Sequence, residues 1–331
     1  MPIKVNVITG FLGVGKTSTI QHLLKNKPVN EYWAIIVNEF GEVGIDESLL
    51  ATKDQQSPIR QIPGGCVCCT AGTALQTTLN ELITKVKPDR ILIEPSGIGH
   101  PAGIIDTLEE GLKNKATIQA VITLIDPRNL GSEKHMGHET FIDQIELADI
   151  LIATKTDLCT EKEVAHYHSW AEELYPPKQQ VLTTTFGAIP ITLLDEERTT
   201  VRKAKFPQAH LHEHHHHTTC VTPTITEPAF YESKGFGTIA LGAIFTKEIL
   251  FDADKLHYYL EAIQGTERIK GVFRTTHRWL TYNRTEQDMA ALFPSAYRKD
   301  SRIEIILSEN SPFTLEVFKK GMIQLMNSCK V

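Results

Sequence analysis

No stretch of this 331-residue sequence stays apolar for long enough to cross a membrane, and positive charge is not in excess. A membrane-spanning helix needs roughly 20 consecutive apolar residues. The 34 Lys and Arg residues face 40 Asp and Glu residues, and the net charge of −6 argues against a general nucleic-acid binder. The first residues lead directly into an apolar run, so we expect no cleavable signal. These absences favour a cytoplasmic protein with no membrane and no nucleic-acid partner.

Six cysteines are few for this length, which excludes a disulfide framework. Three of them crowd into Cys66-Val67-Cys68-Cys69, directly after Pro63-Gly64-Gly65, and this crowding indicates metal or redox chemistry in a reducing compartment. Thiolates are good zinc ligands, and Cys66 and Cys68 point to the same side of an extended segment. Three cysteines leave a tetrahedral site incomplete, so a carboxylate, a histidine or water must supply the fourth ligand. Redox-active cysteines and inert buried cysteines are the alternatives.

The clearest motif that the sequence contains is a glycine, four residues and Gly-Lys-Thr, at positions 10–17. It lies between an apolar run over 3–9, which predicts a buried strand, and a helical stretch that begins at Ser18. Glycines let backbone N–H groups approach phosphate oxygens, and the start of a helix favours negative charge. We expect Lys16 to contact the β- and γ-phosphates and the Thr17 hydroxyl to bind Mg²⁺. A glycine-rich turn with a chance Lys-Thr is the alternative. The expected phosphate-binding residues are Gly10, Gly13, Val14, Gly15, Lys16, Thr17 and Ser18.

Acidic residues lie at or after the carboxyl ends of two further predicted strands, which is where open α/β sheets bind ligands. The apolar run 33–37 leads into the segment 38–46, in which Glu39, Glu42 and Asp46 are candidates for Mg²⁺, its waters or a second metal. A solvated acidic loop is the alternative there. The strand predicted over 90–94 ends in Glu94 and is followed by Pro95-Ser96-Gly97. We expect Glu94 to hold Mg²⁺ through water and the Gly97 N–H to approach the γ-phosphate.

A strand predicted over 148–153 ends in Thr154-Lys155-Thr156-Asp157. This tetrapeptide resembles the guanine-reading Asn-Lys-x-Asp of GTPases, with Thr in the first place. The Asp157 carboxylate can accept both the N1–H and the 2-amino group of guanine, and adenine offers no such pair, while the Lys155 stem can cover the base. GTP is therefore the expected nucleotide. We expect Thr154, in place of Asn, to weaken both the anchoring of the loop and the contact to the base, and so to make the preference for GTP less strict. An ordinary strand end followed by helix-capping residues is the alternative.

The periodic pattern fails from about Leu194 to Ser233, where charged residues, Thr and Pro dominate. This segment contains a dense histidine tract, and such a composition is typical of metal capture. A disordered polar linker without a ligand is the alternative. The histidines of the tract are His210, His212, His214, His215, His216 and His217.

Strands alternate with helices over residues 1–193, which predicts an α/β domain with a mostly parallel sheet and helices on both faces. Residues 194–233 are then a flexible linker. Residues 234–331 predict a smaller α+β domain, with strands over 237–245, 269–274, 278–283 and 301–308 and helices over 252–263 and 313–326. We find no internal repeat.

Together these motifs resemble the CobW family of P-loop GTPases. The resemblance covers nearly the whole chain, and its most specific element is the Gly-x-Cys-x-Cys-Cys run Gly64–Cys69. The phrases at 37–46 and 94–101 look most like the YeiR branch of that family, whose members are described as zinc-binding GTPases. Many relatives carry a Glu just before Asn38, where this chain has Val37.

The resemblance implies slow, Mg²⁺-dependent GTP hydrolysis by Lys16, Thr17 and Glu94. It also implies coupling to zinc or another transition metal that is delivered to an unidentified client metalloprotein. Glu42 is then a candidate carboxylate ligand beside Cys66, Cys68 and Cys69. One alternative is a zinc buffer or sensor with vestigial nucleotide use, against which the intact Lys16, Thr17 and Glu94 argue. The other is a P-loop kinase of small molecules, for which we find no Arg-rich lid. Association into a homo-oligomer is left open.

Overall fold

The computed structural model describes residues 2–38, 59–62, 71–99, 101–112, 115–199, 202–206, 223–224, 227–235, 238–285, 290–295 and 298–329. The chain divides into two compact units, one with the described residues up to Phe206 and one with those from Pro223 onward. Several candidate residues lie outside the described part of the chain: Glu39, Glu42, Asp46, Cys66, Cys68, Cys69 and the six histidines of the tract. In the described residues, no helix combines the length and the apolarity that a membrane crossing requires.

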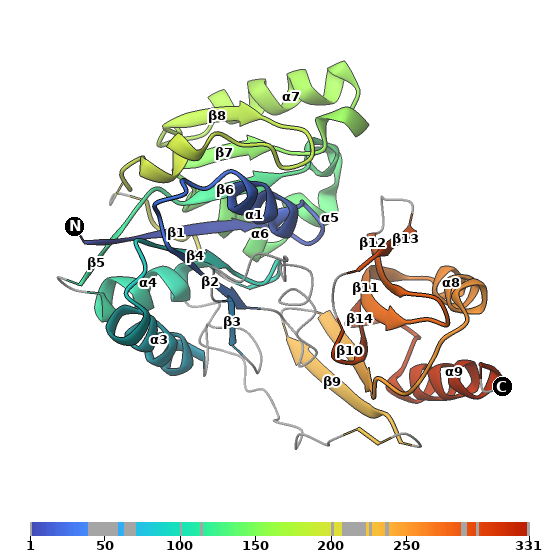
Figure 1. Cartoon of the computed structure of the whole chain (residues 1–331). Coiled ribbons are helices and arrows are strands. Elements are labelled where there is room, and N and C mark those ends of the chain that lie inside the picture. The colour runs from blue at the N-terminus through green and yellow to red at the C-terminus, as the bar shows by residue number, and fades with distance from the viewer. Residues whose placement is uncertain are drawn as a thin grey trace. The chain divides into compact units, whose positions relative to one another are not determined.

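The first unit is built on a parallel sheet with the strand order β3-β2-β4-β1-β6-β7-β8, and β5 also pairs with β1 (Figure 1). All these pairings are parallel. Runs of β-branched residues, buried on both faces of the sheet, favour this arrangement. The parallel sheet expected from the sequence is therefore confirmed. The strands are β1 (Ile3–Gly10), β2 (Trp33–Asn38), β3 (Ile59–Ile62), β4 (Arg90–Glu94), β5 (Ala116–Ile118), β6 (Ile122–Ile125), β7 (Ile150–Ala153) and β8 (Gln180–Thr183).

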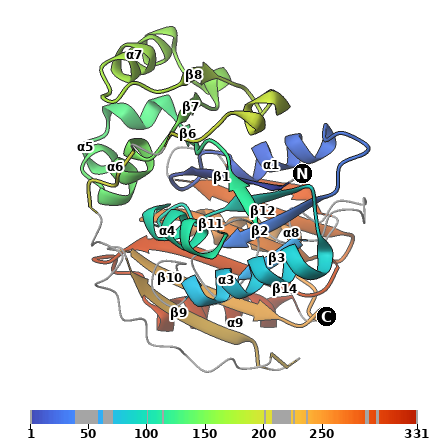
Figure 2. The same ribbon diagram turned by 90° about the vertical axis from the view of Figure 1, so that its left-hand side faces the viewer.

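Helices cover both faces of this sheet (Figure 2). Leu79 of α3 and Leu108 of α4 pack with Val5 and Val7 of β1 in one apolar cluster. The connection from β1 to β2 runs in the opposite direction along the sheet from the connection between β3 and β4, so the right-handed rule places α1 on the other face. The main helices are α1 (Lys16–Lys25), α3 (Ala71–Glu81), α4 (Pro101–Gly111), α5 (Glu133–Met136), α6 (Glu139–Glu146) and α7 (Glu161–Glu172). Short helical turns are η1 (Leu82–Val86), η2 (Pro127–Gly131), η3 (Thr156–Leu158) and η4 (Ile191–Asp195).

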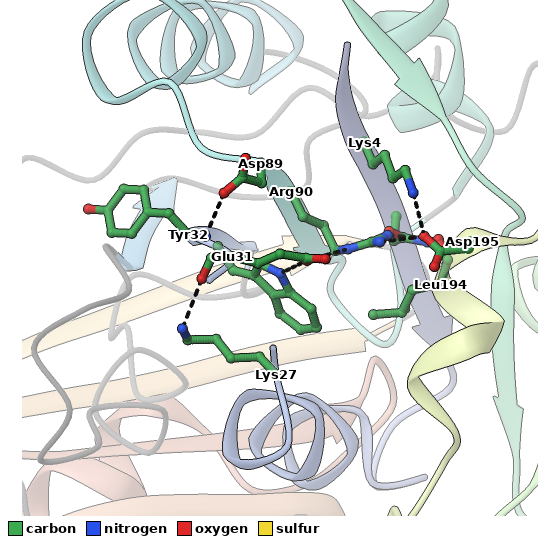
Figure 3. Close-up of polar contacts among 10 residues, drawn as sticks. Lys4, Lys27, Glu31, Tyr32, Asp89, Arg90, Leu194 and Asp195 are labelled. Carbon is green, nitrogen blue, oxygen red and sulfur yellow. Dashed lines mark hydrogen bonds and ion pairs between the residues drawn. The ribbon is translucent and has the colours of Figure 1, made fainter. Parts of the chain in front are cut away.

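A buried arginine joins the amino ends of β1 and β4 to the last residues of η4 (Figure 3). Arg90 is 2% exposed and donates to Asn6 Oδ1 at 2.6 Å, to the Leu194 carbonyl at 2.7 Å and to Asp195 Oδ1 at 2.6 Å. Lys4 Nζ also reaches Asp195 Oδ1, at 2.7 Å. Burial alone would raise the pKa of Asp195, but the hydrogen bonds from Lys4 and Arg90 outweigh it and hold the pKa below its usual range. Segments far apart in the sequence are thereby tied together.

Two buried carboxylates extend this attachment beyond η4. Asp149 Oδ1 accepts from the Thr199 backbone at 3.1 Å and from Arg202 Nε at 2.9 Å. Asp143 Oδ1 accepts from the backbone N–H groups of Lys205 and Phe206 at 2.8 and 3.0 Å. Residues assigned by sequence to the start of the linker therefore lie on the first unit. The domain limits 1–193, 194–233 and 234–331 themselves stay a prediction.

The second unit is an antiparallel sheet with the strand order β13-β12-β11-β14-β10-β9. Leu256 and Leu260 of α8 and Phe318 and Met322 of α9 are fully buried against it in one apolar core. The α+β architecture expected for the C-terminal part is confirmed, and β9 begins inside the stretch that the sequence assigned to the linker. The elements are β9 (Ala229–Gly235), β10 (Thr238–Phe245), α8 (Ala253–Ala262), β11 (Thr266–Arg274), β12 (Trp279–Thr285), β13 (Ala291–Pro294), β14 (Ser301–Ser308) and α9 (Leu315–Ser328).

Candidate nucleotide-binding site

The candidate residues of the first unit gather at one edge of the parallel sheet. Because all strands run in one direction, the loops after β1, β4, β6, β7 and β8 leave from the same edge. The chain order reverses at β1, which pairs with β4 on one side and β6 on the other. Ligands of open α/β sheets bind at such a switch point. The glycine loop follows β1 and therefore lies where a ligand is expected.

Glycine conformations shape the loop between β1 and α1. Gly10 has φ 143°, and a Cβ there would lie 2.5 Å from the Leu124 carbonyl oxygen of the neighbouring strand. Gly13 and Gly15 also have positive φ, at 74° and 95°. Gly15 is the N-cap of α1, so no side chain caps this helix start, and its first turn holds no acidic residue. Uncapped N–H groups and the helix dipole make this end suited to an anion.

The lysine and the threonine of the motif, Lys16 and Thr17, lie in the first turn of α1. Lys16 is 6% exposed, and its Nζ donates to the carbonyl oxygens of Gly10 at 2.8 Å and of Phe11 at 3.0 Å. Thr17 Oγ1 donates to Glu94 Oε1 at 2.8 Å, although the two residues are 77 positions apart in the chain. The structure thus brings together Lys16, Thr17 and Glu94, the three residues that the sequence assigns to catalysis.

The segment after β4 approaches the glycine loop very closely. A Cβ added at Gly97 would lie 2.8 Å from the backbone nitrogen of Leu12 and 2.9 Å from its Cα. Gln144 Nε2 of α6 donates to the Gly97 carbonyl at 3.1 Å and holds this segment from the other side. Only glycine fits this approach without moving a backbone. Gly97 therefore lies beside the phosphate loop, as expected for a residue near the γ-phosphate.

Thr154 takes part in anchoring the loop 154–157, which holds the residues that the sequence predicts for base recognition and which we call the base-reading loop; that this anchoring is weaker than with Asn stays a prediction. Thr154 is 2% exposed, and its Oγ1 donates to the Val14 carbonyl at 2.7 Å and lies 3.3 Å from the Ile125 carbonyl. A short hydroxyl is sufficient because β7 and β1 flank β6, so the loop starts close to the glycine loop. A hydroxyl donor at the end of a buried strand is the sequence signal that could have found this anchor.

Charged residues surround the loop that follows β7. Lys155 has φ 55°, and its Nζ lies 3.7 Å from Asp126 Oδ2. Asp126 follows β6 and is 3% exposed, and Arg128 binds it with two donors, Nε at 2.9 Å and Nη2 at 2.5 Å. Asp157 is exposed. Sequence reasoning missed Asp126 as a residue that holds Lys155, although a carboxylate at the end of a buried strand was a usable signal.

Cys159 lies in the same loop but is poorly suited to bind a metal. Burial, followed by the charge of Asp126, raises the pKa of its thiol to about 11. Its Sγ donates to the Lys155 carbonyl at 3.4 Å. The thiol therefore stays protonated near neutral pH, and metals bind the thiolate. Within the described residues, no group of three or more His, Cys, Asp or Glu side chains is placed to hold a metal ion.

The glycine loop lies at the switch point of a parallel sheet, and the loop after β7 is tied to it. This arrangement defines a nucleotide-binding protein of the P-loop class. Comparison with known proteins narrows this class. The family model described as CobW/HypB/UreG, nucleotide-binding domain, matches residues 4–182. The chain belongs to this family.

Individual proteins of known name are also similar to this chain. The zinc chaperone YeiR of Escherichia coli (strain K12) is 37% identical over 313 residues, which cover 93% of this chain and 94% of that protein. The zinc chaperone YjiA of the same organism is 34% identical over 201 residues, covering 58% of this chain and 61% of that protein. The crystal structure of the Zn(II)-bound YjiA GTPase from E. coli covers 98% of this chain and 99% of its own, with 22% identity and a TM-score of 0.43.

Proposed function

We propose that this protein is a zinc-binding GTPase that hydrolyses GTP to GDP and phosphate and couples its nucleotide state to the delivery of a metal. The observation that carries the proposal is the hydrogen bond between Thr17 and Glu94, next to Lys16 and in the same unit as the anchored Thr154–Asp157 loop. The residues that we propose for phosphate, Mg²⁺ and base binding therefore all follow strands at one edge of the sheet. The relatives YeiR and YjiA, both named zinc chaperones, support zinc as the cargo.

Thr17 and Glu94 suit Mg²⁺ because hydroxyl and carboxylate oxygens are the hard ligands that this ion prefers. Mg²⁺ would neutralise negative charge on the phosphates when it is bound. Lys16 adds a positive charge that is tethered to the loop, and the uncapped start of α1 adds partial positive charge. These groups bind and orient the phosphates, which is the main protein contribution to phosphoryl transfer.

Selection of guanine is assigned to Asp157. Its exposed carboxylate can accept two donors from guanine, and Lys155 is held in position by Asp126. Titration of GTP and ATP should show tighter binding of GTP in wild type, and Asp157→Ala should weaken GTP binding much more than ATP binding. Equal wild-type affinities for the two nucleotides would remove guanine selectivity from the proposal.

The metal part of the proposal rests on sequence and relatives. Cys66, Cys68 and Cys69, with Glu42 as a further candidate ligand, are proposed to hold zinc or another transition metal for an unidentified client metalloprotein. The tract His210–His217 is proposed to collect metal more weakly, because thiolates are softer ligands than imidazoles and hold zinc more firmly. A zinc buffer with vestigial nucleotide use, or a small-molecule kinase, would share the fold but not the metal-modulated phosphate release.

Phosphate release from GTP is the measurement that tests the enzyme. We expect Mg²⁺-dependent turnover in wild type, and a loss of roughly 100-fold in Lys16→Ala, because a cation at the phosphates is removed. Lys25→Ala on the same helix is the matched control and should turn over like wild type, since Lys25 is exposed. Unchanged turnover in Lys16→Ala would refute the assignment, and release that requires an added acceptor would favour a kinase.

A further inference from the structure

The loop after β8 lies directly beside the base-reading loop. β8 pairs with β7 in parallel, up to Ala153 opposite Thr183. The two loops that follow these strands are then joined, because Thr156 Oγ1 donates to the Thr184 carbonyl at 3.1 Å. Thr184 is itself tied back to Ala153 by a backbone hydrogen bond of 2.7 Å. The loop after β8 therefore has a fixed place next to Lys155 and Asp157.

This loop makes a tight turn that is strained at its first central residue. The Ala188 N–H donates to the Thr185 carbonyl at 3.0 Å and closes the turn, and the two residues between them both have positive φ. Gly187, at φ 72°, suits such a turn, but Phe186 adopts φ 52°. A bulky side chain at positive φ is a genuine outlier, and strain of this kind is found mostly at functional sites.

Packing holds the turn against the start of α1 and leaves the aromatic ring outside. A Cβ added at Gly187 would lie 2.8 Å from the Cα and from the backbone nitrogen of Thr19, just after the Lys16–Thr17 pair. Phe186 is 81% exposed. Its ring therefore gains little from packing within the fold, although its backbone is forced into an unfavourable conformation. The turn lies between the two elements that bracket a nucleotide, the phosphate-binding helix start and the base-reading loop.

We propose that Phe186 is a nucleotide-binding residue whose ring packs against the face of the base. The aliphatic stem of Lys155 would cover another part of the same base. This inference deepens the proposed function and rests on it. Stacking of a base on an aromatic ring is independent of base identity, because every base has a π face. Phe186 is thus expected to add affinity for GTP, GDP and ATP alike, whereas Asp157 distinguishes guanine from adenine.

The test compares wild type with Phe186→Gly, and Phe293→Ala is the matched control for loss of an exposed phenyl ring, since Phe293 is 62% exposed. Titrations use GDP, a non-hydrolysable GTP analogue, a non-hydrolysable ATP analogue and inorganic tripolyphosphate. In Phe186→Gly we expect about tenfold weaker binding of all three nucleotides and unchanged binding of tripolyphosphate. Phe293→Ala should bind all four ligands like wild type.

Thermal unfolding without ligand gives the second readout. Glycine relieves the left-handed strain, so the Tm of Phe186→Gly should rise by about 2–4 °C while its nucleotide affinity falls. A Tm that falls by several degrees would mean that the ring packs within the fold, and it would overturn the inference. Nucleotide affinities within twofold of wild type would overturn it as well. If wild type itself binds no guanine nucleotide, the proposed function fails and this inference fails with it.

Discussion

At the scale of single residues, Thr154 shows how a short hydroxyl side chain can join two loops. Its Oγ1 donates to the Val14 carbonyl and so ties the base-reading loop to the phosphate loop. Val14 is 1% exposed, so its carbonyl oxygen would have little access to water if this donor were removed. The same bond fixes the position of the Lys155–Asp157 segment relative to the glycine loop.

Replacement of Thr154 by the isosteric valine tests this bond. We expect Thr154→Val to lower the free energy of unfolding by about 1–3 kcal/mol, because a buried acceptor is left without its donor. Binding of GTP should weaken at the same time. Urea denaturation and nucleotide titration measure the two effects, with Thr154→Ser as the control that keeps the hydroxyl. Wild-type behaviour of Thr154→Val in both experiments would contradict the anchoring role.

At the scale of elements, the close approach of the loop after β4 to the glycine loop depends on Gly97. A methyl group there meets the Leu12 backbone, so Gly97→Ala must push the two loops apart. A displacement of about 1 Å in a catalytic arrangement costs roughly 100-fold in rate. We expect a loss of that order in phosphate release from GTP. Gly131→Ala is the control, since a Cβ at Gly131 meets nothing within 4 Å. Equal rates of phosphate release in the two variants would contradict the role of Gly97.

At the amino ends of the strands, Arg90 joins β1, β4 and η4 (Figure 3). Arg90→Met leaves buried acceptors without a donor, and we expect it to lower the free energy of unfolding by about 3–5 kcal/mol. Lys4→Met removes only a partly exposed pair with Asp195 and should cost less than about 1 kcal/mol. Chemical denaturation compares the two. Similar losses in both variants would show that Arg90 is not the centre of this network.

At the scale of the whole molecule, nucleotide and metal are expected to influence each other. Segments that contact Mg²⁺ and phosphate commonly change order when the γ-phosphate is lost. The cysteine run lies in sequence between two segments that we propose for this role, 38–46 and 94–97. We therefore expect zinc to bind more tightly with a non-hydrolysable GTP analogue than with GDP. By linkage, zinc must then raise the affinity for GTP by the same factor.

Zinc titrations of wild type and of Cys66/Cys68/Cys69→Ser, each with GDP and with the GTP analogue, test this coupling. The triple variant should lose the tight site, and deletion of His210–His217 should remove only weakly bound zinc and leave basal turnover nearly intact. If wild type binds zinc with the same affinity in the presence of GDP and of the GTP analogue, the coupling is excluded. A triple variant that binds zinc as tightly as wild type would exclude the cysteines as ligands.

The amino-acid sequence alone was enough to predict the phosphate loop, the strand that ends in Glu94, the strand that precedes Thr154, the parallel sheet and the separate α+β unit. The signals for these features are local, because a motif or an apolar periodicity is contained in a short stretch of neighbouring residues. The anchoring by Thr154, the role of Asp126 and the packing of the turn at Phe186 and Gly187 against α1 were decided only by the fold. Each of them depends on distances between loops that follow different strands. Such distances are set by strand order and packing, which no single stretch of the chain contains.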